Sequence, residues 1–316
     1  MAAKPSLICI TGASGFIGRH LTSRLLKEPG VRVRCLSRKK TAPSTSECKA
    51  EWFQGDLRVP RTLEGFIERD CVVVHLAYAP QDSRAEKIEA AVNLARAVAE
   101  GGARRLIHVS TAVLNGPSGS ATITETSACH PASEYQETKI AIERALEDEL
   151  SGRSGLSIIR PTCVYGPGGK NLLKLCREAE SDPLALKYAK RSILRHRRLN
   201  LVHVANVVEA IWHVARLEAA SGETFIVSED DLPENNFGDV SAFVEQGLGL
   251  RRLPAPVLAL PKPLLRPFFA VLGRSHANAT VNYSCEKLLR SGYRRPVSFR
   301  EGLDDFLAWY RRQRLP

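Results

Sequence analysis

The chain has 316 residues, of which 44% are hydrophobic and 25% charged, a composition that excludes a largely disordered protein and suits one large globular domain or two small ones. Its net charge of +11 suits anionic partners. The bases of a single-stranded nucleic acid stack on aromatic side chains, and the most basic stretch, 187–198, has one, Tyr188, which argues against such a partner. The eight cysteines form no CxxC pair, and Cys9, Cys35 and Cys71 lie in apolar runs, which indicates buried thiols in a reducing, cytoplasmic compartment. The first apolar run begins at residue 7, which leaves no room for a secretory signal.

Strand-like and helix-like runs alternate through the first half of the chain. The predicted strands are 7–10, 31–36, 51–54, 72–76, 106–110 and 156–160, and the predicted helices are 16–27, 61–68, 84–100 and 135–150. This alternation predicts an α/β fold with a Rossmann-type, doubly wound parallel sheet. After Pro161 the prolines become frequent, and a helix over 207–217 and a strand over 223–227 follow. We expect a Rossmann dinucleotide-binding domain over 1–165 and mainly a smaller substrate-binding lobe over 166–316, with some segments returning to the sheet.

The first predicted strand runs into the sequence TGASGFIG at 11–18, which has three glycines three residues apart. The first glycine permits a tight turn, the second lets the backbone approach a pyrophosphate, and the third lets the next helix pack on its strand. The start of that helix offers free N–H groups and a partial positive charge to an anion. The motif therefore predicts dinucleotide binding, with a plain tight turn as the alternative.

The second predicted strand leads into Ser37 and Arg38, about 20 residues beyond the glycines. An enzyme that uses NAD usually has Asp or Glu here to bind the ribose 2′-hydroxyl, and a carboxylate would repel a 2′-phosphate. Arg38 can instead hold that phosphate by charge-assisted hydrogen bonds. The sequence therefore favours NADP over NAD, which stays possible; the alternative is that these cations only cover the surface.

Tyr135 and Lys139 are four residues apart in a predicted helix, so both side chains project from one face. A nearby ammonium favours the phenolate and lowers the tyrosine pKa, as general acid–base catalysis requires. The strand before this helix ends at Ser110 and Thr111, whose hydroxyls could donate to a substrate carbonyl. Taken alone, such hydroxyls more often end a strand than take part in catalysis.

Together these features resemble the extended, sugar-nucleotide-modifying form of the short-chain dehydrogenase/reductase superfamily, the NAD-dependent epimerase/dehydratase family. The resemblance runs nearly end to end. It rests on TGASGFIG at 11–18, GDL at 55–57, HLA at 75–77, VST at 109–111, YQETK at 135–139, RPTCVYGPG at 160–168, LVHV at 201–204, GYRRP at 292–296 and EGL at 301–303.

The resemblance implies a role for each matching residue. Tyr135 is the expected acid/base, Lys139 is expected to lower its pKa and bind the nicotinamide ribose, and Thr111 is the expected catalytic hydroxyl. The cofactor-binding residues it implies are Gly12, Ser14, Gly15, Phe16, Ile17, Gly18, Ser37, Arg38, Asp56, Leu57, Leu76, Ala77, Ser110, Tyr135, Lys139, Pro161 and Val164. The substrate-binding residues it implies are Thr111, Asn115, Asn171 and Arg198. It implies no metal, since no ligand cluster accompanies His75 or His108.

Four positions depart from the family pattern. Lys87 stands where the family often has Asn, Asn115 replaces a usual Tyr, and Ala205 replaces an Asp. Arg198 matches a common arginine only with a one-residue offset. The substrate contacts are therefore less well defined than the cofactor contacts.

The expected chemistry is hydride transfer at a sugar carbon, and the same residues serve reduction and epimerisation. The preference for NADP favours reduction, and 165–207 and VSEDD at 227–231 are similar to bacterial enzymes that reduce the 4-keto group of UDP-2-acetamido-2,6-dideoxyhexulose for lipopolysaccharide or related surface glycans. The alternatives are a nucleotide-sugar 4-epimerase, a hydroxysteroid- or dihydroflavonol-type reductase, and a non-catalytic NADP-sensing regulator.

Two further expectations concern assembly and membranes. The family resemblance suggests a homodimer through helices of the Rossmann domain. The apolar stretch 254–272 holds Lys262, Arg266 and five prolines, so it cannot span a bilayer. It could touch a membrane surface or pack inside the C-terminal part.

Overall fold

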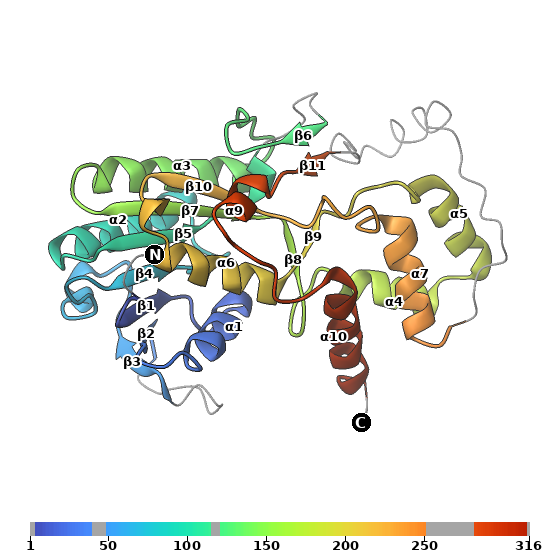
Figure 1. Ribbon diagram of the computed structural model, residues 1–316, viewed down its shortest axis with the longest axis horizontal. Coiled ribbons are helices and arrows are strands. Elements are labelled where there is room, and N and C mark those ends of the chain that lie inside the picture. Colours follow the sequence, from blue (N-terminus) through green and yellow to red (C-terminus); the bar gives the residue numbers. More distant parts are fainter. Residues whose placement is uncertain (1–3, 40–48, 115–120, 251–280, 315–316) are drawn as a thin grey trace.

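The computed structural model describes residues 4–39, 49–114, 121–250 and 281–314. Within this part of the chain, seven parallel strands form one sheet in the order β10-β7-β5-β4-β1-β2-β3 (Figure 1). The strands are β1 (Leu7–Thr11), β2 (Arg32–Ser37), β3 (Glu51–Gln54), β4 (Val72–His75), β5 (Arg105–Val109), β7 (Gly155–Pro161) and β10 (Glu223–Val227). The order reverses beside β1, as in a doubly wound sheet. The predicted Rossmann-type fold is therefore confirmed.

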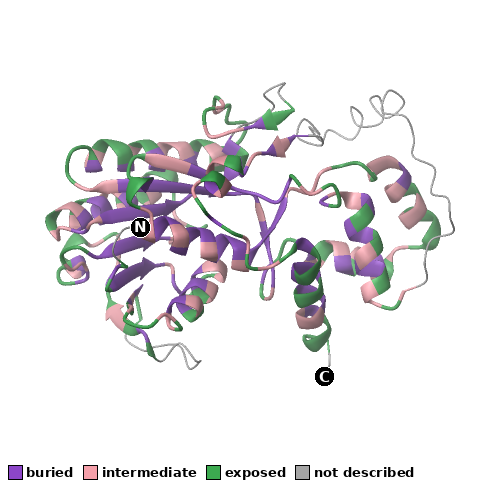
Figure 2. Ribbon diagram, viewed as in Figure 1, coloured by how far each residue is buried: buried purple, intermediate pink, exposed green. Residues whose placement is uncertain are grey.

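Helices cover both faces of the sheet, and the side chains of β1 alternate between them. Ile8 and Ile10 belong to a core with α1 (Phe16–Leu25) and α6 (Val204–Arg216). Leu7 and Cys9 belong to a second core with α2 (Arg84–Glu100) and α3 (Glu134–Leu150). Figure 2 shows the central strands buried between these helices. Burial on both faces explains why the strands read as continuous apolar runs.

One predicted helix is wrong. The expected helix over 61–68 is a short 3-10 helix, η2 (Pro60–Leu63), followed by turns. Gly65 has a φ of +76°, outside the right-handed helical region, so the chain cannot continue as a helix there. The other predicted strands and helices differ from the structure only at their ends.

A second lobe extends from the carboxyl edge of the sheet, and its core includes Tyr165, Cys176, Val244 and Phe306. Its helices are α4 (Leu173–Ser181), α5 (Leu184–Leu194), α7 (Phe237–Gly247) and α10 (Phe299–Arg312) (Figure 1). Two short sheets connect the parts: β8 (Cys163–Tyr165) pairs with β9 (Leu201–His203), and β6 (Thr122–Ile123) pairs with β11 (Asn282–Tyr283). The remaining elements are η3 (Ala112–Leu114), η4 (Glu218–Ala220) and α9 (Glu286–Arg290).

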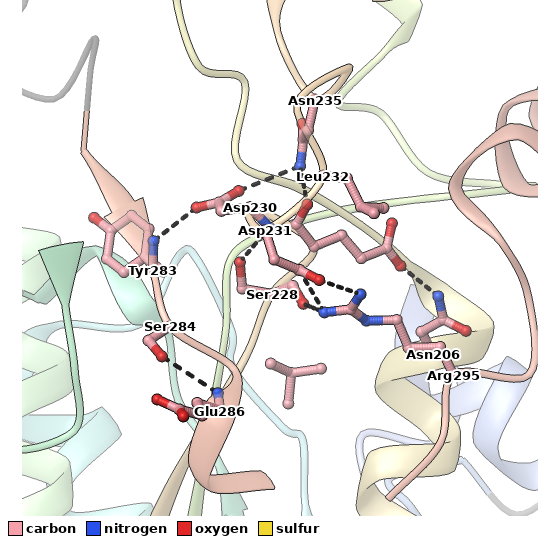
Figure 3. Close-up of polar contacts among 12 residues, drawn as sticks. Asn206, Ser228, Asp230, Asp231, Leu232, Asn235, Tyr283, Ser284, Glu286 and Arg295 are labelled. Atoms are coloured by element: carbon pink, nitrogen blue, oxygen red, sulfur yellow. Dashed lines mark hydrogen bonds and ion pairs between the residues drawn. The ribbon is translucent and has the colours of Figure 1, made fainter. Parts of the chain in front are cut away.

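A polar network follows β10 and ties the lobes together (Figure 3). Asp230 accepts from the backbone N–H of Tyr283 at 2.9 Å and from the amide of Asn235 at 3.2 Å. Asp231 pairs with Arg295, 2.6 Å between Oδ1 and Nη2. The VSEDD sequence at 227–231 thus anchors the C-terminal segment, an internal structural role that needs no substrate to explain it.

The part of the chain that the structure describes contains no helix both long and apolar enough to cross a membrane. The apolar stretch 254–272 lies outside the described residues.

Candidate active site

A cavity of about 830 Å³ opens where β1, β2, β3 and β4 end. The carboxyl ends of parallel strands meet at one edge of a sheet, so short segments that follow separate strands converge there. The predicted cofactor residues that line the cavity are Gly12, Ser14, Gly15, Ser37, Arg38, Asp56, Leu57, Leu76 and Ala77. The structure therefore brings together most of the residues expected to bind the dinucleotide.

Two of the three glycines, Gly12 and Gly15, line this cavity, and Gly18 lies just behind them in α1. Gly12 has a φ of +74°, and a Cβ there would lie 2.6 Å from the backbone nitrogen of Ala77. Gly15 is the N-cap of α1, is exposed, and would bring a Cβ no nearer than 3.2 Å to the Gly12 carbonyl oxygen. At Gly18 a Cβ would lie 2.7 Å from Ala13 Cα, so this glycine lets α1 pack closely on the turn. The loop has the cradle shape that a pyrophosphate requires.

Gly12→Ala is expected to abolish measurable dinucleotide binding. The positive φ disfavours Ala by about 1–2 kcal/mol, and the clash with Ala77 must also move the backbone of the loop. Gly30→Ala is the matched control, because Gly30 has a similar φ of +76° with nothing within 4 Å of its Cβ position. Thermal melting and titration with fluorescent NADPH would separate the two; equal NADPH binding in both variants would contradict the assignment of Gly12.

Cations gather at the end of the cavity beside β2 and β3. Arg38, Lys39 and Arg58 line it and are exposed. Asp56 pairs with Arg58, 2.9 Å between Oδ2 and Nη2, and this hydrogen bond holds the pKa of Asp56 below its usual value. Trp52 lines the same end. Arg58 and Trp52 were not predicted from the sequence, although Trp52 lies in the predicted strand 51–54 and Arg58 directly follows the GDL sequence at 55–57.

Thr111 and Tyr135 meet beside the end of β5. Thr111 is buried, whereas Tyr135 stands on the first turn of α3 and is 43% exposed. Partial burial of its ring raises the pKa of Tyr135, and a hydrogen bond with the Thr111 hydroxyl opposes that shift. The expectation that Lys139 lowers the pKa of Tyr135 is not met, since the net shift is upward and its causes are burial, Tyr78 and Thr111.

Lys139 lies one turn farther along α3 and is buried. Burial lowers its pKa to about 8, and the Glu143 carboxylate opposes that shift. Glu143 is itself bound to Arg160, 3.1 Å between Arg160 Nε and Oε1. Lys139 is thus still mostly protonated at neutral pH, with a pKa much closer to neutrality than that of a free lysine.

The other predicted cofactor residues lie around the cavity rather than in its lining. Phe16, Ile17 and Gly18 form the first turn of α1, and Pro161 and Val164 are buried in β7 and β8. Ser110 is also buried, and its hydroxyl has no hydrogen-bond partner among the described residues. The glycine cradle, the cations and this unpartnered hydroxyl fit a nicotinamide dinucleotide.

The predicted substrate residues are not gathered in the same way. Asn115 lies outside the described residues. Asn171 donates its amide to the Val164 carbonyl at 2.6 Å, and Arg198 donates from Nη1 to the Leu232 carbonyl at 2.9 Å. Both therefore have structural partners within or beside the second lobe.

The basic stretch 187–198 is also partly neutralised. Lys190 Nζ lies 2.6 Å from Asp182 Oδ2 and 2.9 Å from Glu178 Oε2. Arg191 Nη2 lies 2.9 Å from Glu245 Oε2. These two cations pair within the lobe, so the stretch offers less free positive charge to an anionic partner than its sequence suggests.

No cluster of three or more His, Cys, Asp or Glu side chains within the described ranges could hold a metal ion. His75 and His108 pair on adjacent strands, with ring centroids 5.2 Å apart. Burial lowers the pKa of both, to about 3 for His75, and Thr11 Oγ1 lies 2.7 Å from His75 Nδ1. They are neutral groups of the sheet interior.

The chain is similar to several known proteins. The chain is 32% identical over 204 residues to a ceramide reductase of Caulobacter vibrioides, a match that covers 63% of this chain and 57% of that enzyme. It is 29% identical over 288 residues, 86% of each chain, to a dTDP-4-dehydrorhamnose reductase of Mycobacterium tuberculosis. The fold is similar to the UDP-glucuronic acid 4-epimerase of Bacillus cereus solved with NAD, with a TM-score of 0.72, 18% identity, and 97% of this chain and 99% of that chain covered.

A family model described as the NAD dependent epimerase/dehydratase family matches residues 8–228, more than half of the chain. This match contains the glycine loop, the strands that line the cavity, and the helix with Tyr135 and Lys139. The chain belongs to the NAD-dependent epimerase/dehydratase family, whose members are enzymes of the extended short-chain dehydrogenase/reductase type.

Proposed function

We propose that the protein is an NADPH-dependent ketoreductase that reduces the 4-keto group of a nucleotide-activated deoxysugar, of the UDP-2-acetamido-2,6-dideoxyhexulose type. The observation that carries the cofactor preference is the position of Arg38 in the cavity lining, next to Ser37 at the end of β2, where an NAD-dependent enzyme usually has a carboxylate. Lys39 and Arg58 add positive charge to the same end.

The chain's own residues can carry the proton chemistry of this reduction. A bound nicotinamide supplies the hydride. Tyr135 donates its phenolic proton to the carbonyl oxygen, and the Thr111 hydroxyl donates a hydrogen bond to the same oxygen as negative charge develops on it. Lys139 binds the nicotinamide ribose and returns a proton to Tyr135, a task for which its pKa of about 8 suits it.

The choice of reduction over epimerisation rests on the cofactor preference. An epimerase recycles its dinucleotide, which is usually NAD, whereas a reductase consumes NADPH, the cofactor that Ser37 and Arg38 favour. The similarity to dTDP-4-dehydrorhamnose reductase over 86% of each chain supports the choice of a nucleotide-linked keto sugar.

Arg38→Ala is expected to weaken NADPH binding by about 10- to 100-fold and to leave NADH binding nearly unchanged, because a charged hydrogen bond contributes about 1.5–3 kcal/mol. Titration of both dinucleotides against the purified protein measures this. Arg61→Ala, an exposed arginine outside the cavity lining, is the matched control. Equal weakening of NADPH and NADH would refute the 2′-phosphate assignment.

An apolar ketone is the second candidate substrate. The side chain of Val113 is 38% exposed, and its carbonyl accepts from Gln136 Nε2 at 2.7 Å, which places this apolar surface beside Tyr135. The ceramide reductase match points the same way. The loss of NADPH absorbance is measured with UDP- and dTDP-linked 4-keto sugars and, separately, with keto lipids and ketosteroids. The class of ketone that is turned over decides between a nucleotide-linked sugar and an apolar substrate. NADPH binding without turnover of any of them would favour the non-catalytic regulator.

The homodimer, the contact with a membrane surface and the cytoplasmic location stay predictions.

A further inference from the structure

Tyr78 lies where the proposed cofactor cavity meets α3, the helix that carries Tyr135 and Lys139. It follows the HLA sequence at the end of β4, and it lines the cavity. Its ring meets that of Tyr135 edge to face, with centroids 5.7 Å apart and planes at 79°. The sequence pattern gave no reason to select this residue, because the contact joins two elements that are far apart in the chain.

The ring of Tyr78 also lies against two ammonium groups. Lys139 Nζ is 4.5 Å from the ring centroid and Lys87 Nζ is 5.1 Å from it. The negative face of an aromatic ring attracts a cation, most strongly where water is excluded. Lys139 is 6% exposed, so the ring replaces part of the hydration that this ammonium loses.

Lys87 anchors the arrangement from α2. Its Nζ donates to the backbone carbonyl of Asp82, which keeps this second ammonium near the ring. Lys87 is the position at which the chain departs from the Asn of the family pattern. In this structure the departure supplies a cation that binds Tyr78.

We propose that Tyr78 is a positioning residue that fixes Lys139 and Tyr135 for the nicotinamide half of the cofactor. A carboxylate or amide in its place would hold Lys139 by occupying the N–H donors of the ammonium. A ring face attracts the charge without a lone pair that competes for those donors, so Lys139 can still bind ribose hydroxyls. The inference rests on the proposed dinucleotide cofactor, but on the half that NADPH and NADH share.

Tyr78→Leu and Tyr78→Phe, compared by titration with three probes, test this role. Tyr78→Leu is expected to weaken NADPH and NADH by about tenfold and to leave adenosine 2′,5′-bisphosphate, which lacks the nicotinamide half, within about twofold of the unmodified protein. Tyr78→Phe keeps the ring and should bind all three probes normally. Normal binding of both dinucleotides by Tyr78→Leu, or an equal loss for all three probes, would overturn the proposal.

A second measurement uses the protein without cofactor. The rate at which Lys139 is acetylated is measured at a series of pH values by peptide mass spectrometry. The midpoint, the pH at which this rate reaches half of its maximum, should be roughly one unit lower in Tyr78→Leu than in Tyr78→Phe. An unchanged midpoint counts against the proposal, and Tyr78→Met makes the same comparison should the Leu variant not fold. Tighter binding of NADH than NADPH by the unmodified protein would refute the NADP preference and leave the Tyr78 result standing.

Discussion

Tyr135→Phe is expected to lower turnover by about 100- to 10,000-fold, the usual contribution of a general acid, while NADPH affinity stays within about twofold. Only the phenolic oxygen is lost. The ring that meets Tyr78 edge to face remains, so the wall of the site beside Lys139 keeps its shape. The loss should therefore fall on kcat, because the proton donor acts only as the carbonyl oxygen gains charge.

Tyr310→Phe is the matched control for this change. Its hydroxyl donates to Glu180 Oε2 at 2.9 Å in the second lobe, outside the residues that line the cofactor cavity. It removes the same oxygen from a tyrosine and should leave kcat unchanged. The assignment of Tyr135 would be refuted by a Tyr135→Phe enzyme of normal turnover, or by an equal loss in the control.

The cofactor side of the site could be predicted because each of its residues follows a strand directly. Gly12, Arg38, Asp56 and Ala77 come just after four separate predicted strands, and a parallel sheet brings such positions to one edge. The position of each of these residues depends only on the strand that directly precedes it in the sequence. The strand assignment was therefore enough to bring these four positions to one edge of the sheet, whereas the roles expected of Asp56 and Ala77 came from the family resemblance.

The substrate side could not be predicted in this way. Arg198 and Lys190 bind partners that the chain brings to them only on folding, the Leu232 carbonyl for one and Asp182 with Glu178 for the other. From the sequence alone a basic stretch looks unpaired, because the acidic and carbonyl groups that bind it come from other segments of the chain. The same limit hid Tyr78, whose role depends on contacts with α2 and α3 rather than on its own neighbours in the sequence.

Glu229 is a buried carboxyl in the network that follows β10. It is fully buried, Oε1 accepts from the Asn206 amide and from the backbone N–H of His203 at 3.3 Å, and Oε2 has no partner among the described residues. Burial raises its pKa to about 7 from the ordinary 4.5. Between these two values the folded protein binds a proton that the unfolded chain has released, so the free energy of unfolding falls as pH rises.

Glu229→Gln is expected to remove this loss and to stabilise the protein at pH 8 by up to about 3 kcal/mol, since one pKa unit corresponds to about 1.4 kcal/mol. At pH 4 the Glu229 carboxyl is neutral in the fold and mostly neutral in the unfolded chain, and the Gln carbonyl can accept the same two hydrogen bonds, so the two proteins should then unfold alike. Urea unfolding at both values measures the difference, and Glu234→Gln, an exposed carboxylate in the same loop, is the control. A Glu229→Gln variant with the pH dependence of the unmodified protein would show that Glu229 ionises freely in the fold. The expected result would instead mean that Glu229 makes its largest contribution to the free energy of unfolding below neutral pH, where its carboxyl keeps its proton.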